Sequence, residues 1–543
     1  MIVSHNEGAI VPGIPLSNQA EPATVRPSRR PPSALGTGNR HALWNWSAFL
    51  GRILVLACVL ATPGFSLELG IGGGTDTGIM LPDMGDSSET FLSAADEKRL
   101  GEAFMREARA RISVIDEPEI SSYLNSLGYR LASHSGTMDA GMGNTAAAKT
   151  HFTFFAVRDP AINAFAVPGG FIGINAGLIL NTESESELAS VLAHEIAHIR
   201  QHHIARAMQF GDAMNPLTMA GLLAALIIGT QSSQAGRAAI TAVTAGSIQS
   251  RIDFTRANEK EADRLGIGVL ASAGLDPRAM PNFFERLQTA HRYYSAPPEF
   301  LSTHPVTVSR IADSRNRAEQ YPYRQYSDSL AYHLVRAHLR VMMAKNPRQS
   351  VEYFQDALRS GKYRNQKAAR YGLALASMAA SNWQRARTEI TNLLKTDPDH
   401  VIFRARQAEI ELESDHIPHA MRLYAEALLA HPENALLIHG YVRALLQTNE
   451  PKKVIALLDR QKKKKHRNPE LQELLAKAFA RTGDKVGANM ALAEFHYLNG
   501  DLDAAIRQLR IALDASTGNY YQGSRIEARL REFQEEKRLL TKR

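Results

Sequence analysis

The chain has 543 residues, of which 44% are hydrophobic and 22% charged, and its formal net charge at pH 7 is +8. This length allows about three domains, and the hydrophobic fraction is ample for folded cores. A charge this mild on so long a chain favours some attraction to anionic membrane surfaces, which leaves peripheral membrane contact open. It gives no reason to expect a nucleic acid as partner.

The first part of the chain has the composition of a segment that does not fold. Residues 1–47 are predicted to be a disordered extension, because they are rich in Pro, Ser, Gly and Arg and lack apolar periodicity. Residues 48–67 are predicted to be a signal peptide, since a basic flank precedes an apolar run that is too short to span a bilayer. A Gly-, Asp- and Ser-rich linker follows over 68–90. We therefore expect secretion to the periplasm, with membrane association left open.

Cys58, the only cysteine, lies inside this apolar run. It is a candidate for lipoprotein acylation, but Leu56 is bulky where a small residue is usual. We favour cleavage of the signal near residues 61–67, which leaves a mature protein without cysteine and hence without disulfides.

Strands and a turn are predicted before the first chemical motif. A helix is expected to begin at Ser93, and "HFTFFAV" over 151–157 predicts a strand. The stretch "NAFAVPGGFIGINAG" predicts paired strands that turn at Pro-Gly-Gly. Zinc peptidases commonly hold substrate as an added strand on a sheet edge. Phe165, Ala166 and Val167, or else Phe171–Gly173, are the candidates for that edge; an ordinary core hairpin is the alternative.

The stretch "HEIAH" fits the pattern H-E-x-x-H. On a helix His194 and His198 share a face and can converge on one zinc ion, while Glu195 beside them can serve as a general base. The preceding residues predict the helix, with Thr182 or Ser184 as its cap and acidic residues in its first turn. Alone, however, the motif can occur by chance and needs a third ligand.

His202 and His203 follow in the same stretch. On a continuous helix His202 lies about 12 Å along the axis from His194, too far for the same ion, and His203 points elsewhere. We expect both to be supporting or surface residues rather than ligands.

Residues 213–248 contain the mainly apolar run "PLTMAGLLAALIIG", whose fourteen residues are too few to span a bilayer. A buried helix is one interpretation. The other is a mobile or membrane-touching flap that controls substrate access to the metal site.

The third ligand is sought in "RANEKEADRLGIGVLASAGLDP", which predicts a helix ending near Gly274. Glu259 and Asp263 are four apart and share a face, whereas Glu261 points to the other side. Because the histidines of a zinc site need a partner for their outer N–H, this pair suits one ligand and one supporting carboxylate. A solvated acidic face is the alternative.

His304 precedes a proline, so we expect it on an extended turn and, taken alone, at the surface. From about residue 330 the pattern changes to successive helices with short turns. Pro398 and Pro432 are 34 residues apart, and each follows a small residue, Ala386 or Ala420, by twelve positions. Matching positions recur at Tyr424, Ala427, Ser350, Phe354, Ala357, Ala505, Leu509 and Ala512. This period indicates tetratricopeptide repeats, which stack into a solenoid with a concave binding face.

With its H-E-I-A-H and E-K-E-A-D motifs, "NAFAVPGGFIGINAGLI" and "LSTHPVTVSRIA", the chain resembles the M48 family of zinc metallopeptidases, in the form that carries tetratricopeptide repeats. The resemblance implies zinc ligands His194, His198 and Glu259, base Glu195 and supporting carboxylate Asp263. It also implies that His304 is a reversible fourth ligand that keeps the enzyme latent.

We accordingly expect a mainly α, α+β fold, with a zincin-like metallopeptidase domain over 91–325 and an all-α tetratricopeptide solenoid over 330–540. The implied function is that of a periplasmic zinc endopeptidase, with one zinc per chain and a further chaperone role. It would act in outer-membrane protein assembly and quality control. Its partners would be outer-membrane proteins as substrates and, through the repeats, the barrel-assembly machinery.

The alternative function is that of a scaffold or chaperone whose zinc site is closed or structural. An intramembrane peptidase is disfavoured, because no continuous apolar run reaches the length of a membrane span.

Overall fold

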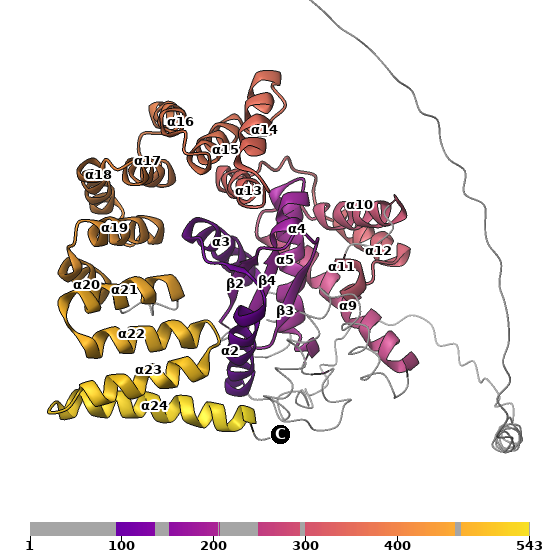
Figure 1. The fold of residues 1–543 in the computed structure, drawn as a ribbon. Helices are drawn as coiled ribbons and strands as arrows, with labels where there is room; N and C mark the ends of the chain where they lie inside the picture. The colour runs from indigo at the N-terminus through magenta and orange to yellow at the C-terminus, as the bar shows by residue number, and fades with distance from the viewer. Residues whose placement is uncertain are drawn as a thin grey trace, which may run out of the picture. The chain divides into compact units, whose positions relative to one another are not determined.

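The computed structural model describes residues 94–135, 151–204, 206, 248–293, 299–461 and 468–541 (Figure 1). The extension, signal peptide, linker and Cys58 therefore lie outside the described residues, as do Ser93 and all but the last residue of 213–248. The domain limits at 325 and 330 stay predictions. Among the described helices, none combines the length and the apolar character needed to cross a membrane.

A small sheet and several helices form the part of the fold before residue 320. Their bounds are α2 Ala94–Arg111, β1 Val114–Ile115, α3 Pro118–Ser135, β2 Thr153–Val157, β3 Ala164–Val167, β4 Phe171–Asn175, α4 Ala176–Asn181, α5 Glu185–Arg200, α9 Ile248–Ser272, α10 Ala279–Tyr293, α11 Glu299–Thr303 and α12 Val308–Ala318.

The sheet has the strand order β1-β2-β4-β3. β2 and β4 are parallel, while β1 and β3 each run antiparallel to their neighbour. The predicted strand and hairpin are thus both confirmed. The turn needs Gly169 and Gly170, whose φ angles of +80° and +85° are costly for residues with a side chain. β3 forms one edge of the described sheet, whereas Phe171–Gly173 lies in β4, between two strands, and so is wrong as an edge candidate.

The apolar core lies where α5 packs against β3, β4, α3, α9 and α10. α5 is buried along nearly its whole length, and the Ser184 side chain caps it by accepting a hydrogen bond from the Glu187 N–H at 3.2 Å. Of the two caps considered, Ser184 is therefore the one used. Burial on all sides holds α5 in place, which suits a helix that carries chemical groups.

The helix that carries Glu259 ends as predicted. α9 stops at Ser272, and Gly274 takes a left-handed φ of +69°. The Leu275 N–H then donates to the Leu270 carbonyl at 2.9 Å, which satisfies one of the last free carbonyls of the helix.

Paired helices follow one another along the rest of the chain (Figure 1). They are α13 Leu330–Met342, α14 Pro347–Ser360, α15 Gln366–Ala379, α16 Trp383–Thr396, α17 Val401–Glu413, α18 Ile417–Ala430, α19 Ala435–Gln447, α20 Pro451–Arg460, α21 Pro469–Thr482, α22 Lys485–Leu498, α23 Leu502–Ala515 and α24 Tyr520–Thr541.

The predicted repeat positions lie where these helices cross. Ala386, Ala420 and Ala505 are fully buried. The ring of Tyr424 occupies the space in which a Cβ at Gly440 would stand, so a small residue is required there. Close packing of adjacent helices thus explains the 34-residue pattern of small residues.

Among the contacts that join the repeat helices to the earlier part of the fold, two sets lie at the first turns of α3 and α5. The first surrounds Glu119 at the start of α3, whose Oε2 accepts hydrogen bonds from Tyr371 at 2.6 Å and Arg406 at 2.7 Å and lies 3.0 Å from His338 Nδ1. Burial alone would raise the pKa of Glu119, but His338, Arg406 and Tyr371 together hold it at about 2.

The second set ties the start of α5 to the start of α13. The Glu185 carboxylate accepts hydrogen bonds from the N–H and the hydroxyl of Ser329 at 2.8 and 2.7 Å, and the Glu185 N–H donates to Asp328 at 2.7 Å. Because Ser329 is also the cap of α13, one small cluster fixes the first turns of both helices.

Candidate metal centre

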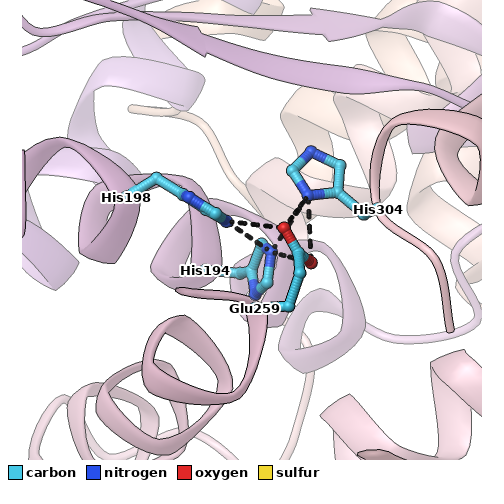
Figure 2. Close-up of side chains that lie close together, drawn as sticks. All are labelled: His194, His198, Glu259 and His304. Carbon is cyan, nitrogen blue, oxygen red and sulfur yellow. Dashed lines mark hydrogen bonds and ion pairs between the residues drawn. The ribbon is translucent and has the colours of Figure 1, made fainter. Parts of the chain in front are cut away.

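α5 directs His194 and His198 to the same side, as their spacing predicts. Their Nε2 atoms are 3.0 Å apart, and the side chains are 1% and 9% exposed. Glu259 reaches them from α9, which packs against α5; its carboxylate oxygens lie 3.4 Å from His194 Nε2 and 3.3 Å from His198 Nε2 (Figure 2). The fold therefore brings the three predicted ligands together.

His304 completes this group from the turn after α11. Its Nδ1 lies 3.0 Å from Glu259 Oε1 and 3.3 Å from His194 Nε2, and its ring stacks on Phe300. His304 is 9% exposed, so the expectation of a surface histidine is wrong, and the prediction drawn from the family resemblance matches its position. Ligand atoms of the four residues all lie within 4.8 Å of one another.

These separations fit a zinc site. Ligand atoms bound to one tetrahedral zinc at about 2.0–2.1 Å are separated from each other by about 3.3–3.5 Å. The observed distances of 3.0–3.4 Å are close to this value. The donor set of imidazole nitrogen and carboxylate oxygen is also one that zinc accepts.

The electrostatics of the pocket favour a positive ion. Burial alone would lower the pKa of His194, but Asp263 and Glu259 raise it to about 10. Burial lowers the pKa of His198 to about 3, so this ring is neutral, as a metal ligand must be. Without a metal the pocket thus retains a proton on His194, and metal binding has to release it.

Glu195 follows His194 on α5 and faces the same pocket. It is 1% exposed, and its Oε1 lies 3.4 Å from His304 Nε2. Burial raises the pKa of Glu195, against the lowering effect of His304, His194 and the Ala166 backbone N–H. A buried carboxyl with a raised pKa, next to potential metal ligands, suits proton transfer.

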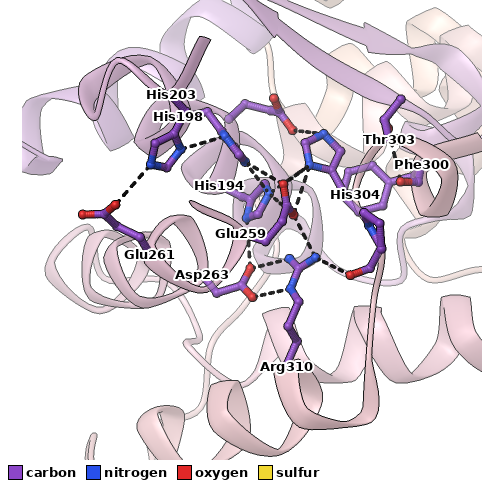
Figure 3. A network of polar contacts seen from close by, with 12 residues as sticks. His194, His198, His203, Glu259, Glu261, Asp263, Phe300, Thr303, His304 and Arg310 are labelled. Atoms are coloured by element: carbon purple, nitrogen blue, oxygen red, sulfur yellow. Dashed lines mark hydrogen bonds and ion pairs between the residues drawn. The ribbon is translucent and has the colours of Figure 1, made fainter. Parts of the chain in front are cut away.

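Asp263 lies behind His194 rather than beside the presumed ion. Its Oδ1 is 3.0 Å from His194 Nδ1, on the far side of the ring from Glu259. Arg310 of α12 binds both oxygens of Asp263, at 2.7 and 2.8 Å, and also contacts Glu259 at 2.8 Å (Figure 3). Asp263 therefore holds His194 in position, and Arg310 holds both carboxylates.

Sequence reasoning missed Arg310. The available signal was its position on the buried face of α12, together with Ile311, Ser314 and Ala318, where a charged residue needs a partner.

The two histidines after the motif, His202 and His203, make different contacts. His202 turns away and pairs with Glu97 at 3.1 Å. His203 is buried and contacts His198, with its other nitrogen 3.2 Å from Glu261 Oε2 (Figure 3). Neither is placed among the ligand atoms, as expected, and Glu261 points away from the ligand face of α9.

The proposed substrate edge lies beside the catalytic pocket. Phe165, Ala166 and Val167 belong to β3, at the edge of the sheet, and Ala166 is the only one of them that is not buried. Since α5 packs against β3, this edge adjoins the pocket, and the Ala166 backbone N–H lowers the pKa of Glu195.

Comparisons with known proteins agree with this geometry. Residues 135–318 match the model of peptidase family M48, and residues 412–478 match a tetratricopeptide repeat. The beta-barrel assembly-enhancing protease of Escherichia coli (strain K12) is 36% identical over 470 residues, covering 86% of this chain and 94% of that protein.

Two further relatives show how far the likeness extends. The putative beta-barrel assembly-enhancing protease of Vibrio cholerae is 37% identical, over 79% of this chain and 87% of that protein. The mitochondrial metalloendopeptidase OMA1 of Arabidopsis thaliana is 26% identical, over 45% of this chain and 43% of that protein. By sequence, fold and donor set, the chain belongs to peptidase family M48, as a zinc metallopeptidase joined to tetratricopeptide repeats.

Proposed function

We propose that this chain is a periplasmic zinc endopeptidase that acts in the assembly and quality control of outer-membrane barrel proteins. The names of its relatives from Escherichia coli and Vibrio cholerae support this role, since both are described as beta-barrel assembly-enhancing proteases. The repeat helices offer the kind of extended surface that binds other proteins, and the barrel-assembly machinery is the partner we propose for it.

His194, His198 and Glu259 are the residues that hold zinc in this proposal, and the convergence of their ligand atoms is the observation that carries it. When bound, zinc supplies a Lewis acid that makes water more acidic and polarises the scissile carbonyl. Asp263 keeps the Nε2 atom of His194 directed at the ion by accepting the proton on Nδ1.

Glu195 moves the proton. Its carboxylate takes a proton from the attacking water and returns it to the leaving amine. Because the group is buried and its pKa is raised, it is a stronger base than an exposed carboxylate and a competent acid in the second step. The edge of β3 orients the peptide by main-chain hydrogen bonds, next to this carboxylate.

In this proposal, His304 keeps the enzyme inactive until its ring leaves the site. A catalytic zinc site keeps one position open for water, and the His304 ring stands among the ligands and 3.4 Å from Glu195. We propose that the ring must leave before water and substrate can enter. The short helix α11 and the turn after it are the segment that would move.

A scaffold or chaperone role is the second candidate, favoured by the length of the repeat region. The two functions separate at Glu195, because a purely structural zinc site has no use for a base beside the ion.

The experiment compares zinc content and casein cleavage for wild type, Glu195→Gln and His304→Ala. We expect one zinc per chain in all three, loss of cleavage by a factor of about 100 or more in the first variant, and faster cleavage in the second. If all three proteins bind zinc and none cleaves casein, the result favours the scaffold function. Unchanged or slower cleavage by His304→Ala would contradict the latency proposal.

A further inference from the structure

His203 and Glu261 form a chain of contacts that ends on His198, a predicted metal ligand. His203 Nδ1 is 2.9 Å from His198 Nδ1, and His203 Nε2 is 3.2 Å from Glu261 Oε2. Arg206 contacts the same Glu261 oxygen at 3.2 Å. His203 is only 3% exposed, so little water competes for these contacts.

The chain must break its helix to make this arrangement. His203 is five residues after His198, and on a continuous helix it would not share a face with it. α5 ends at Arg200, however, and His202 takes a left-handed φ of +49°. This turn brings the His203 ring back against the outer edge of His198, with ring centres 4.8 Å apart. An unfavourable backbone conformation at a non-glycine residue is thus linked to a specific contact.

The direction of each hydrogen bond follows from the groups involved. An ionised carboxylate only accepts, so His203 Nε2 carries the hydrogen that faces Glu261. A neutral imidazole has one N–H, which makes His203 Nδ1 an acceptor. The contact between the two Nδ1 atoms needs one hydrogen, and it must come from His198.

His198 is thereby left with its lone pair on Nε2. This is the atom that lies 3.3 Å from Glu259 and 3.0 Å from His194 Nε2, inside the group of ligand atoms. The opposite tautomer would direct an N–H at the ion and could not bind it.

We infer that Glu261 and His203 act as positioning residues that fix the tautomer and orientation of His198 and so set the affinity of the site for zinc. The inference rests on the proposed role of His198 as a ligand. It gives the two zinc histidines equivalent support: Asp263 contacts His194 directly, and Glu261 acts on His198 through His203.

The test measures the zinc dissociation constant by competition with a chromophoric chelator, on the full chain. His203→Phe keeps a ring of similar size but has no acceptor, and we expect zinc to bind about 10- to 100-fold more weakly. His203→Gln offers an amide oxygen to His198 and an amide N–H to Glu261, and should lose less affinity than His203→Phe. His202→Asn, which tolerates the left-handed conformation of this turn and lies outside the relay, is the matched control and should bind zinc as wild type does.

Folding is checked by the melting temperature of each zinc-free variant. Should His203→Phe fail to fold, Glu261→Leu, which removes the acceptor for the His203 Nε2–H, should still weaken zinc binding. Wild-type affinity in a folded His203→Phe protein, or an equal loss in His202→Asn, would overturn the relay. A separate arm uses His198→Ala: zinc binding that survives it refutes the ligand assignment, and with it the proposed metal site and the relay together.

Discussion

Glu119 and Glu259 are both buried carboxylates that contact histidine and arginine, but their surroundings are built in opposite ways. Around Glu119 the tyrosine hydroxyl and the guanidinium donate hydrogens to one oxygen, and His338 lies against the same atom. Around Glu259 three imidazole nitrogens crowd together, and the Nε2 atoms of His194 and His198 lie only 3.0 Å apart.

The difference separates a structural network from a binding site. Around Glu119 the donors meet at one carboxylate oxygen, Oε2, while the other oxygen is buried without a hydrogen-bond partner among the described residues. Acceptor atoms that converge on one point repel each other until a cation joins them. A cluster of His, Glu and Arg is therefore identified as a metal site by the direction of its lone pairs, and composition alone does not decide.

Metal removal should affect the site around Glu259 and leave the network around Glu119 unchanged. A chelator is expected to abolish cleavage and, relative to protein in zinc at 1,000 times its dissociation constant, to lower the free energy of unfolding by about 4 kcal/mol. Denaturant titration with and without zinc measures this, and adding zinc back should restore both properties. Cleavage that persists in the zinc-free protein would contradict the assignment of the cluster around Glu259 as the catalytic metal site.

The substitution Arg406→Met should destabilise the network around Glu119. It leaves Glu119 buried without the guanidinium that binds it, and such a change costs about 3–5 kcal/mol of stability. The loss should be the same with and without zinc. Arg404→Met, on the same helix α17 but in an exposed pair with Asp399, is the control and should cost at most about 1 kcal/mol. Equal losses for the two variants would show that the buried network contributes nothing special.

The loss of stability at acid pH should include a contribution from the protonation of Glu119. Its native pKa of about 2 lies below the ordinary value of 4.5, so its contribution is complete above pH 4.5 and disappears as the pH falls from there towards 2. This lowering of the Glu119 pKa corresponds to about 3 kcal/mol of the free energy of unfolding. In Glu119→Gln, stability measured by urea titration should fall less steeply over this range. A profile parallel to that of wild type would assign the acid sensitivity to other groups.

The smallest effect is expected at the cap of α5. Ser184→Ala removes the acceptor for the Glu187 N–H and should cost about 1 kcal/mol. Zinc affinity should be unchanged, because the ligands lie more than two turns further along the helix. A large loss of zinc affinity would mean that the ends of α5 control the geometry of its centre.

Local spacing made most of the metal site predictable. His194 and His198 follow from their separation on one helix, and Glu259 with Asp263 follow from theirs on another. The hairpin followed from its Pro-Gly-Gly turn, but its outer strand could not be deduced, because that depends on the parallel pairing of β2 with β4.

The remaining features depend on contacts between distant residues. Arg406 is 287 residues from Glu119, and no periodicity links them. His203 was excluded as a ligand by the geometry of a continuous helix, and its supporting contact depends on the left-handed turn at His202, where no glycine marked it. Arg310 meets Asp263 only after α9 and α12 pack together.

The cluster at Glu185, Asp328 and Ser329 has a mechanical consequence. It joins the first turn of the helix that carries the zinc histidines to the first turn of the repeat helices through three hydrogen bonds. A displacement of α13 would therefore reach α5 directly through these hydrogen bonds. The Glu119 network is a separate connection, and it ends on α3 rather than on the helix that carries the zinc histidines.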